Sequence, residues 1–130
     1  MRYLIFIFIM SLIPALSSAQ DSDSARFSFD KVKHDFGDIF QGKTSETVFS
    51  FTNTGKLPLI ISNIFTTCGC TAPTWPREPV PPNGKGEIKI AFNSTGKIGI
   101  QNKVVTIMSD AAGGPFYLKI SANILPSKLN

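Results

Sequence analysis

Two cysteines, Cys68 and Cys70, stand one residue apart and are the residues of this chain whose type and spacing could do chemistry together. They can close a local disulfide ring, because Gly69 between them can adopt the unusual backbone angles that so small a ring needs. Such a ring encloses almost no chain, so it adds little stability through chain entropy. A tight ring of this kind is strained, and strained disulfides are easier to reduce.

The same pair has two other chemical interpretations. Reduced, the thiolates could act as a redox pair or share a soft metal such as Cu(I) or Zn(II). A structural zinc site usually has four ligands, and nothing in the sequence brings His34 or Met108 to the cysteines. A thioredoxin-type pair has two intervening residues and opens a helix, unlike this one. We predict a disulfide between Cys68 and Cys70 and no cofactor, with the redox pair and the metal site as alternatives.

The surrounding stretch defines a candidate binding or redox locus. It comprises Thr67, Cys68, Gly69, Cys70, Thr71 and Trp75. Trp75 lies among prolines, and we interpret it as a lid over one end of the domain. An exposed tryptophan could instead stack on a sugar. The sequence has no Ser-His-Asp arrangement and no phosphate-cradling glycine loop, so it predicts no catalytic residues and no enzyme.

The N-terminus predicts the compartment. Arg2 precedes an apolar run over residues 3–13, Pro14 breaks the run, and small residues stand at Ser17 and Ala19. This pattern is typical of a secretory signal peptide over residues 1–19, cleaved after Ala19. The apolar run is shorter than the ~20 residues of a membrane helix. We therefore expect an exported protein, periplasmic or secreted, with no transmembrane anchor in the mature chain; an uncleaved N-terminal anchor is the alternative.

The net charge and the number of cysteines restrict which kinds of protein this chain can be. The chain has 13 Lys and Arg against 9 Asp and Glu, a formal net charge of +4. The basic residues are scattered and form no stripe, which argues against a nucleic-acid partner. The mature length suits one domain. Two cysteines are too few to staple a miniprotein, so a hydrophobic core must carry the stability.

Two-residue alternation of apolar and polar side chains predicts the elements that would position the locus. It places Phe49 and Phe51 on one face of their strand, and Ile88, Ile90 and Phe92 on the inward face of theirs. Strands or extended pieces are expected at residues 26–32, 34–42, 44–52, 57–65, 87–92, 101–108 and 116–124. Turns are expected at residues 53–56, 83–86, 93–97 and 109–115, and the prolines from Pro73 to Pro82 favour an extended or loop segment. No window has a helical period. The pattern predicts an all-β, immunoglobulin-like antiparallel sandwich of about seven strands. Its expected bounds are 26–125, after a flexible lead-in at 20–25 and before a tail at 126–130.

Four motifs in this order resemble a known bacterial family. They are His34-Asp35-Phe36-Gly37-Asp38-Ile39, Phe51-Thr52-Asn53-Thr54-Gly55-Lys56-Leu57-Pro58-Leu59, Cys68-Gly69-Cys70-Thr71 followed by Trp75, and Pro82-Asn83-Gly84-Lys85-Gly86. Over residues 29–124 the chain resembles the family called domain of unknown function 1573 and, more distantly, Hydin-type immunoglobulin-like domains. The resemblance implies a small extracytoplasmic β-sandwich with no established enzymatic activity. One departure, Pro82-Asn83-Gly84 in place of a direct Pro-Gly, affects loop geometry.

These observations predict a non-catalytic exported module that binds a protein or cell-envelope component by its loops or a sheet edge. The alternative is a thiol-redox or copper-handling protein that uses Cys68 and Cys70. A further alternative is an accessory carbohydrate-binding module that uses Trp75.

Overall fold

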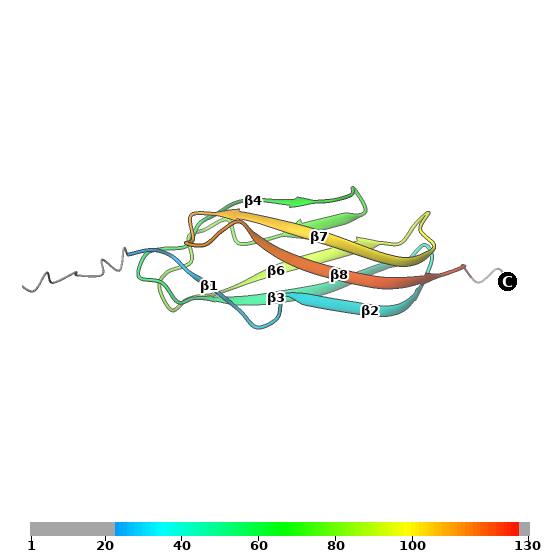
Figure 1. Cartoon of the computed structure of the whole chain (residues 1–130), viewed down its shortest axis with the longest axis horizontal. Coiled ribbons are helices and arrows are strands. Elements are labelled where there is room, and N and C mark those ends of the chain that lie inside the picture. The colour runs from blue at the N-terminus through cyan, green and yellow to red at the C-terminus, as the bar shows by residue number, and fades with distance from the viewer. Residues whose placement is uncertain (1–22, 128–130) are drawn as a thin grey trace, which may run out of the picture.

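The computed structural model describes residues 23–127, and within them every regular element is a β-strand (Figure 1). The strands are β1 (Phe27–Phe29), β2 (Lys33–Phe40), β3 (Thr44–Asn53), β4 (Ile61–Thr66), β5 (Thr71–Thr74), β6 (Lys85–Asn93), β7 (Gly99–Ser109) and β8 (Phe116–Leu125). The predicted signal peptide at 1–19, the start of the lead-in and the end of the tail lie outside the described residues. No helix long and apolar enough to cross a membrane occurs between residues 23 and 127.

The strands form two four-stranded sheets that pack face to face. Sheet I has the order β1-β3-β6-β5, and sheet II has the order β2-β8-β7-β4. Sequential strands are thus divided between the layers, as in a sandwich. The predicted all-β sandwich is confirmed, with eight strands where about seven were expected.

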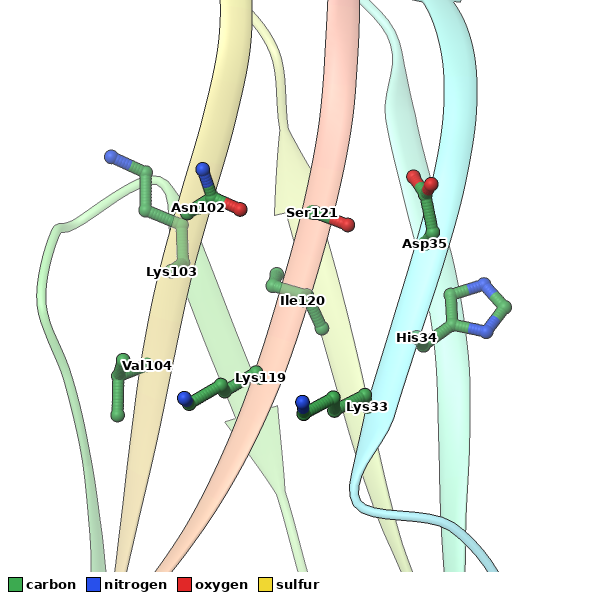
Figure 2. A pocket seen from close by; sticks show the side chains of 9 residues that line it. All are labelled: Lys33, His34, Asp35, Asn102, Lys103, Val104, Lys119, Ile120 and Ser121. Atoms are coloured by element: carbon green, nitrogen blue, oxygen red, sulfur yellow. The ribbon is translucent and has the colours of Figure 1, made fainter.

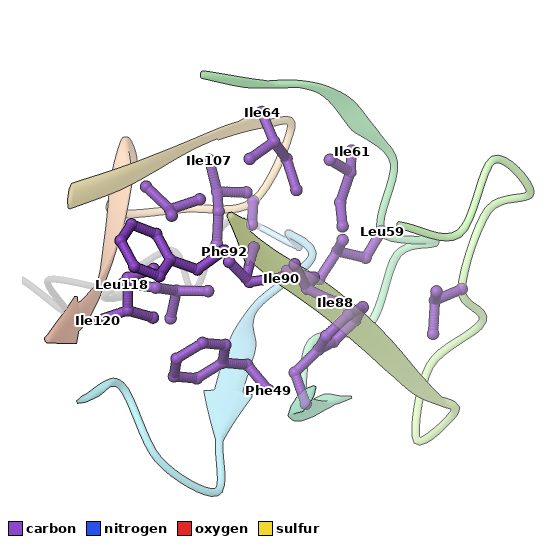
Figure 3. Packing of buried hydrophobic residues seen from close by; sticks show 14 of the residues in the cluster. Phe49, Leu59, Ile61, Ile64, Ile88, Ile90, Phe92, Ile107, Leu118 and Ile120 are labelled. Carbon is purple, nitrogen blue, oxygen red and sulfur yellow. The ribbon is translucent and has the colours of Figure 1, made fainter. Parts of the chain in front are cut away.

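The alternating side chains build the core between the sheets (Figure 3). Sheet I contributes Phe49, Phe51, Ile88, Ile90 and Phe92, and each is at most 1% exposed. The inner face of sheet II contributes Val105, Ile107, Leu118 and Ile120. Full burial of one such side chain contributes about 1.5–3 kcal/mol. The predicted inward faces of β3 and β6 are therefore confirmed.

One segment departs from the predicted bounds because proline and turn residues interrupt it. The strand expected at residues 57–65 begins only at Ile61. Leu57 and Pro58 lie in a loop, and Leu59 forms an isolated antiparallel bridge with Val80. Leu59 is nonetheless fully buried, so a core residue lies outside a regular strand.

Two further segments are strands that were not predicted as such. Lys85 and Gly86, expected in a turn, begin β6. Gly86 pairs with Phe51, and a Cβ at this position would collide with the Phe51 ring, so glycine leaves room for the aromatic side chain. Thr71–Thr74 forms β5, which pairs with β6 although it contains Pro73. An edge strand tolerates proline because one side of its backbone needs no partner.

The start of the domain switches sheets, which alternation cannot reveal. The strand expected at residues 26–32 is shorter and ends at Phe29, and the extended piece expected at residues 34–42 is the separate strand β2. β1 pairs with β3 in sheet I, and three residues later β2 joins sheet II beside β8. The pairing of β2 with β8 is parallel, where the sequence predicted antiparallel neighbours. Lys33 lies opposite Lys119, and the register shifts between Asp35 and Asp38, at Gly37 with φ of 70°.

Candidate functional site

The two cysteines lie on the turn that carries the chain from sheet II to sheet I (Figure 1). β4 before the turn is an edge strand of sheet II, and β5 after it is an edge strand of sheet I. Thr67 and Gly69 are exposed, Cys68 and Cys70 are half-buried, and Thr71 is buried. Cys70 also packs against the core cluster. The turn thus presents one side to solvent while Cys70 anchors it to the core.

Hydrogen bonds fix this turn. The Thr66 hydroxyl lies 3.0 Å from the carbonyl oxygen of Cys68 and 3.2 Å from that of Thr71, and donates to them. The Thr71 N–H donates to the Cys68 carbonyl at 3.3 Å. The Asn93 N–H donates to the Cys70 carbonyl at 2.8 Å, which ties the turn to the end of β6. The backbone around the cysteines is therefore held from both sheets.

The sulfur atoms of Cys68 and Cys70 lie at disulfide-bonding distance, and the two Cα atoms are 5.3 Å apart. The Cys70 N–H also points to the Cys68 Sγ at 3.2 Å. Gly69 is not among the glycines with positive φ, and a Cβ there would meet nothing within 4 Å. The special backbone freedom expected of Gly69 is therefore not used in this conformation.

The candidate extra metal ligand His34 is remote from the cysteines. It lies on β2, at the opposite edge of sheet II from β4. Three inter-strand steps separate these edges, about 14 Å at the usual spacing. Within residues 23–127 the structure contains no group of three or more His, Cys, Asp or Glu side chains that could hold a metal ion.

Trp75 lies away from the cysteines, so the predicted locus is divided. The whole of β5 separates them, and an extended chain from Cys70 to Trp75 spans about 16 Å. The Trp75 ring packs against the core, and the Arg77 guanidinium carbon lies 3.8 Å from its centre. Its Nε1 is buried and has no hydrogen-bond partner within the described part of the chain. The half-buried ring is thus packed against the core on one side and faced by the Arg77 guanidinium.

The outer face of sheet II carries a feature that sequence reasoning missed, an open trough of about 620 Å³ (Figure 2). We call it the lysine trough; it is lined by Lys33, His34 and Asp35 of β2, Asn102, Lys103 and Val104 of β7, and Lys119, Ile120 and Ser121 of β8. Alternation in the sequence indicates which of these side chains share a face. It does not give the register that aligns Lys33 with Lys119 and Asn102 with Ser121.

The surroundings of His34, at the rim of the trough, lower the pKa of its imidazole and so favour the neutral form. Burial is the main cause that lowers its pKa from the ordinary value of 6.5, and the nearby Lys31 charge lowers that pKa further, while Asp35 opposes both. The Lys31 Nζ lies 3.0 Å from the His34 Nδ1. An ammonium group can only donate, so Nδ1 is the acceptor in this contact.

Beside the trough, sheet II exposes large apolar side chains on the same outer face. Phe65 of β4 and Tyr117 of β8 both pair with Thr106 of β7, so the two rings flank one position of the central strand. They are 53% and 54% exposed, and Met108, two residues along β7, is 38% exposed. We call Phe65, Tyr117 and Met108 the apolar row. Exposed apolar clusters of this kind mark interaction surfaces.

A family match identifies the chain. The family model described as "Protein of unknown function (DUF1573)" matches residues 27–124. The chain belongs to this family. That match covers the sandwich, both cysteines, Trp75 and all residues of the lysine trough. No curated protein matches the chain.

Solved structures similar to this DUF1573 chain share its fold. A protein of unknown function from Porphyromonas gingivalis W83 is 20% identical, with a TM-score of 0.68; the match covers 85% of this chain and 50% of that one. The chain therefore spans about half the length of that protein. The ASH/PapD-like domain 7 of human CEP192 is 13% identical, with a TM-score of 0.64 and coverage of 92% and 99%. The YadV chaperone is 13% identical, with a TM-score of 0.53 and coverage of 80% and 53%.

Proposed function

We propose that this chain is a non-catalytic exported immunoglobulin-like module that binds a protein or another cell-envelope component through the outer face of sheet II. The observation that carries the proposal is the apolar row, in which Phe65 and Tyr117 are each more than half exposed on one sheet face. Exposure of such large apolar rings to water is unfavourable, and a partner surface that covers them would remove this exposed area. The likeness to a PapD-like domain and to a chaperone supports a binding role at the level of fold alone.

A capture experiment with paired variants tests the proposal. The bait is wild-type protein, a Phe65→Glu/Tyr117→Glu variant or a Leu57→Glu variant, each incubated with an envelope extract of the source cells. Leu57 is a matched control because it is 47% exposed but lies in the loop after β3. We expect mass spectrometry to identify one partner with wild type and the control, and its loss with the double variant. The same capture by all three baits would show that sheet II is not the binding face.

Export is the second part of the proposal, and it rests on the signal pattern over residues 1–19. We expect the intact mass of protein recovered from the periplasm or the medium to match a chain that begins at Gln20. A mass that retains residues 1–19, in a membrane fraction, would contradict it.

A thiol-redox role is the second candidate function. It is favoured by two sulfur atoms at bonding distance on a half-exposed turn. A redox protein must alternate between the dithiol and the disulfide, so a thiol titration of freshly exported protein should find a mixture of the two forms. If Cys68 and Cys70 were fully oxidised in every preparation, the result would favour a structural disulfide, and the binding module over the redox protein.

A further inference from the structure

The lysine trough concentrates positive charge from strands that are distant in the sequence. Lys33 of β2 and Lys119 of β8 occupy directly paired positions on the outer face. Lys103 of β7 pairs with the buried Ile120, so it lies on the opposite side of the sheet and borders the trough only at its edge. Figure 2 shows the Lys33 and Lys119 side chains side by side and extending in the same direction, with Lys103 at the rim beyond β7. Like charges at paired positions of a sheet repel and are destabilising.

These ammonium groups are not neutralised by the protein. Among residues 23–127 the ion pair within 4.0 Å is that of Lys56 with Asp23, outside the trough. Asp35, the carboxylate that lines the trough, accepts a hydrogen bond from the Gly37 N–H at 2.8 Å. An external anion between Lys33 and Lys119 would relieve their repulsion.

Neutral hydrogen-bond donors stand next to the lysine pair. Ser121 of β8 and Asn102 of β7 occupy paired positions, two residues along their strands from Lys119 and Val104. Among the described residues, neither side chain makes a hydrogen bond, so the Ser121 hydroxyl and the Asn102 amide can donate to a ligand. Val104 adds an apolar surface between these polar groups. Two cations, two neutral donors and an apolar wall together form a surface that suits an oxyanion with a short carbon skeleton.

We propose that the lysine trough is a binding site for a small anion that carries a carboxylate or phosphate group. The anionic oxygens lie between the Nζ atoms of Lys33 and Lys119, and Ser121 and Asn102 donate hydrogen bonds to them. Asp35 of β2 is directly paired with Ser121, so its carboxylate lies beside these donors and disfavours a second anionic group at that end of the trough. This site does not depend on the proposed function, because a small anion can occupy the trough whether or not the apolar row contacts a partner.

The test is an NMR titration of isotope-labelled exported protein with inorganic phosphate and, separately, with succinate. Sodium chloride holds the ionic strength constant. We expect saturating amide shifts confined to the trough segments at residues 33–35, 102–104 and 119–121. The anion that saturates at the lower concentration identifies the preferred group, phosphate or carboxylate.

Paired variants complete the test. A Lys33→Ala/Lys119→Ala variant should weaken binding at least tenfold, because both charges are lost. Lys89→Ala is the matched control: Lys89 is exposed on sheet I and pairs with Val48 and Thr74, and its loss should leave the affinity unchanged. The proposal is overturned if neither anion shifts the trough amides more than sodium chloride does, or if the double variant binds as tightly as wild type.

Discussion

At the scale of single residues, the side chain of Asn53 connects several segments of the chain by hydrogen bonds. The sequence predicted it as part of a turn, but it ends β3 and is fully buried. Its Nδ2 donates to the carbonyls of Leu57 and Val80 at 2.8 and 2.9 Å. Its Oδ1 accepts from the N–H groups of Arg26 and Gly55 at 3.2 and 3.0 Å. One amide thus joins Arg26 just before β1, the loop after β3 and the segment before β6.

We expect Asn53→Asp to lower the free energy of unfolding by roughly 2–4 kcal/mol, because a carboxylate cannot donate to two buried carbonyls. Urea denaturation measures the change. Asn93→Asp is the control, since Asn93 is exposed and its Oδ1 accepts from the Thr95 N–H, which an aspartate also does. Equal stability of the two variants would show that the Asn53 amide does not hold these loops.

His34 supports a prediction about pH. Burial lowers its pKa first, and the Lys31 charge lowers it further. The unfolded chain therefore takes up this proton more readily than the folded chain. The contribution of neutral His34 to the free energy of unfolding is therefore present above pH 6.5, the ordinary pKa of histidine. It is lost as the pH falls below that value.

An NMR titration of the His34 ring should give a midpoint below 6.5 in wild type. Replacement of Lys31 by Met should raise that midpoint, because it removes the nearby positive charge. Lys43→Met, a change of an exposed lysine outside the trough, serves as the control. A wild-type midpoint at or above the ordinary value would refute the prediction.

At the scale of elements, β6 has one face buried in the core and the other exposed to solvent. It lies between β3 and β5 in sheet I. Ile90 is fully buried and pairs with Thr47 and Pro73, while its neighbour Lys89 is exposed. A one-residue step along β6 therefore moves a substitution from the core to solvent.

We expect Ile90→Asp to unfold the domain, because an unpaired buried charge costs several kcal/mol out of a total stability of about 5–15 kcal/mol. Lys89→Asp should change stability by no more than about 0.5 kcal/mol. Far-UV circular dichroism and thermal melts compare the two. If both variants melt alike, the face assignment of β6 is wrong.

At the scale of the whole molecule, we expect stability to come from the packing of the two sheets and not from a bridge between the cysteines. Most of the core side chains come from β3, β6, β7 and β8, whereas the cysteines occupy one turn at the sheet edges. A bridge between Cys68 and Cys70 encloses a single residue, so it restricts the unfolded chain very little. The sandwich is therefore expected to fold with or without it.

We predict that alkylation of exported protein, followed by intact-mass measurement, finds no free thiols before reductant and two after it. Thermal unfolding of a Cys68→Ser/Cys70→Ser variant should correspond to a loss of no more than about 1 kcal/mol. Two free thiols in fresh protein would favour the reduced pair. Collapse of the variant would show that the turn holds the fold.

Local sequence pattern alone predicted most of the strands, the inward faces of β3 and β6, and the sandwich class. Alternation with a period of two is a local property of the chain, and it identified Phe49, Ile88 and Ile90 as core residues. The chemistry of the motif Cys68-Gly69-Cys70 could also be predicted from the sequence, because it depends on residues that are neighbours in the chain. The predicted signal peptide also rests on local pattern alone.

Only the tertiary structure decided which distant residues meet. It placed β2 parallel to β8, which brought Lys33 opposite Lys119, and it set Trp75 at the other end of β5 from the cysteines. Register and sheet membership depend on contacts between segments that are far apart in the chain. A local pattern of polar and apolar residues is compatible with several such arrangements, and only packing of the whole core selects one.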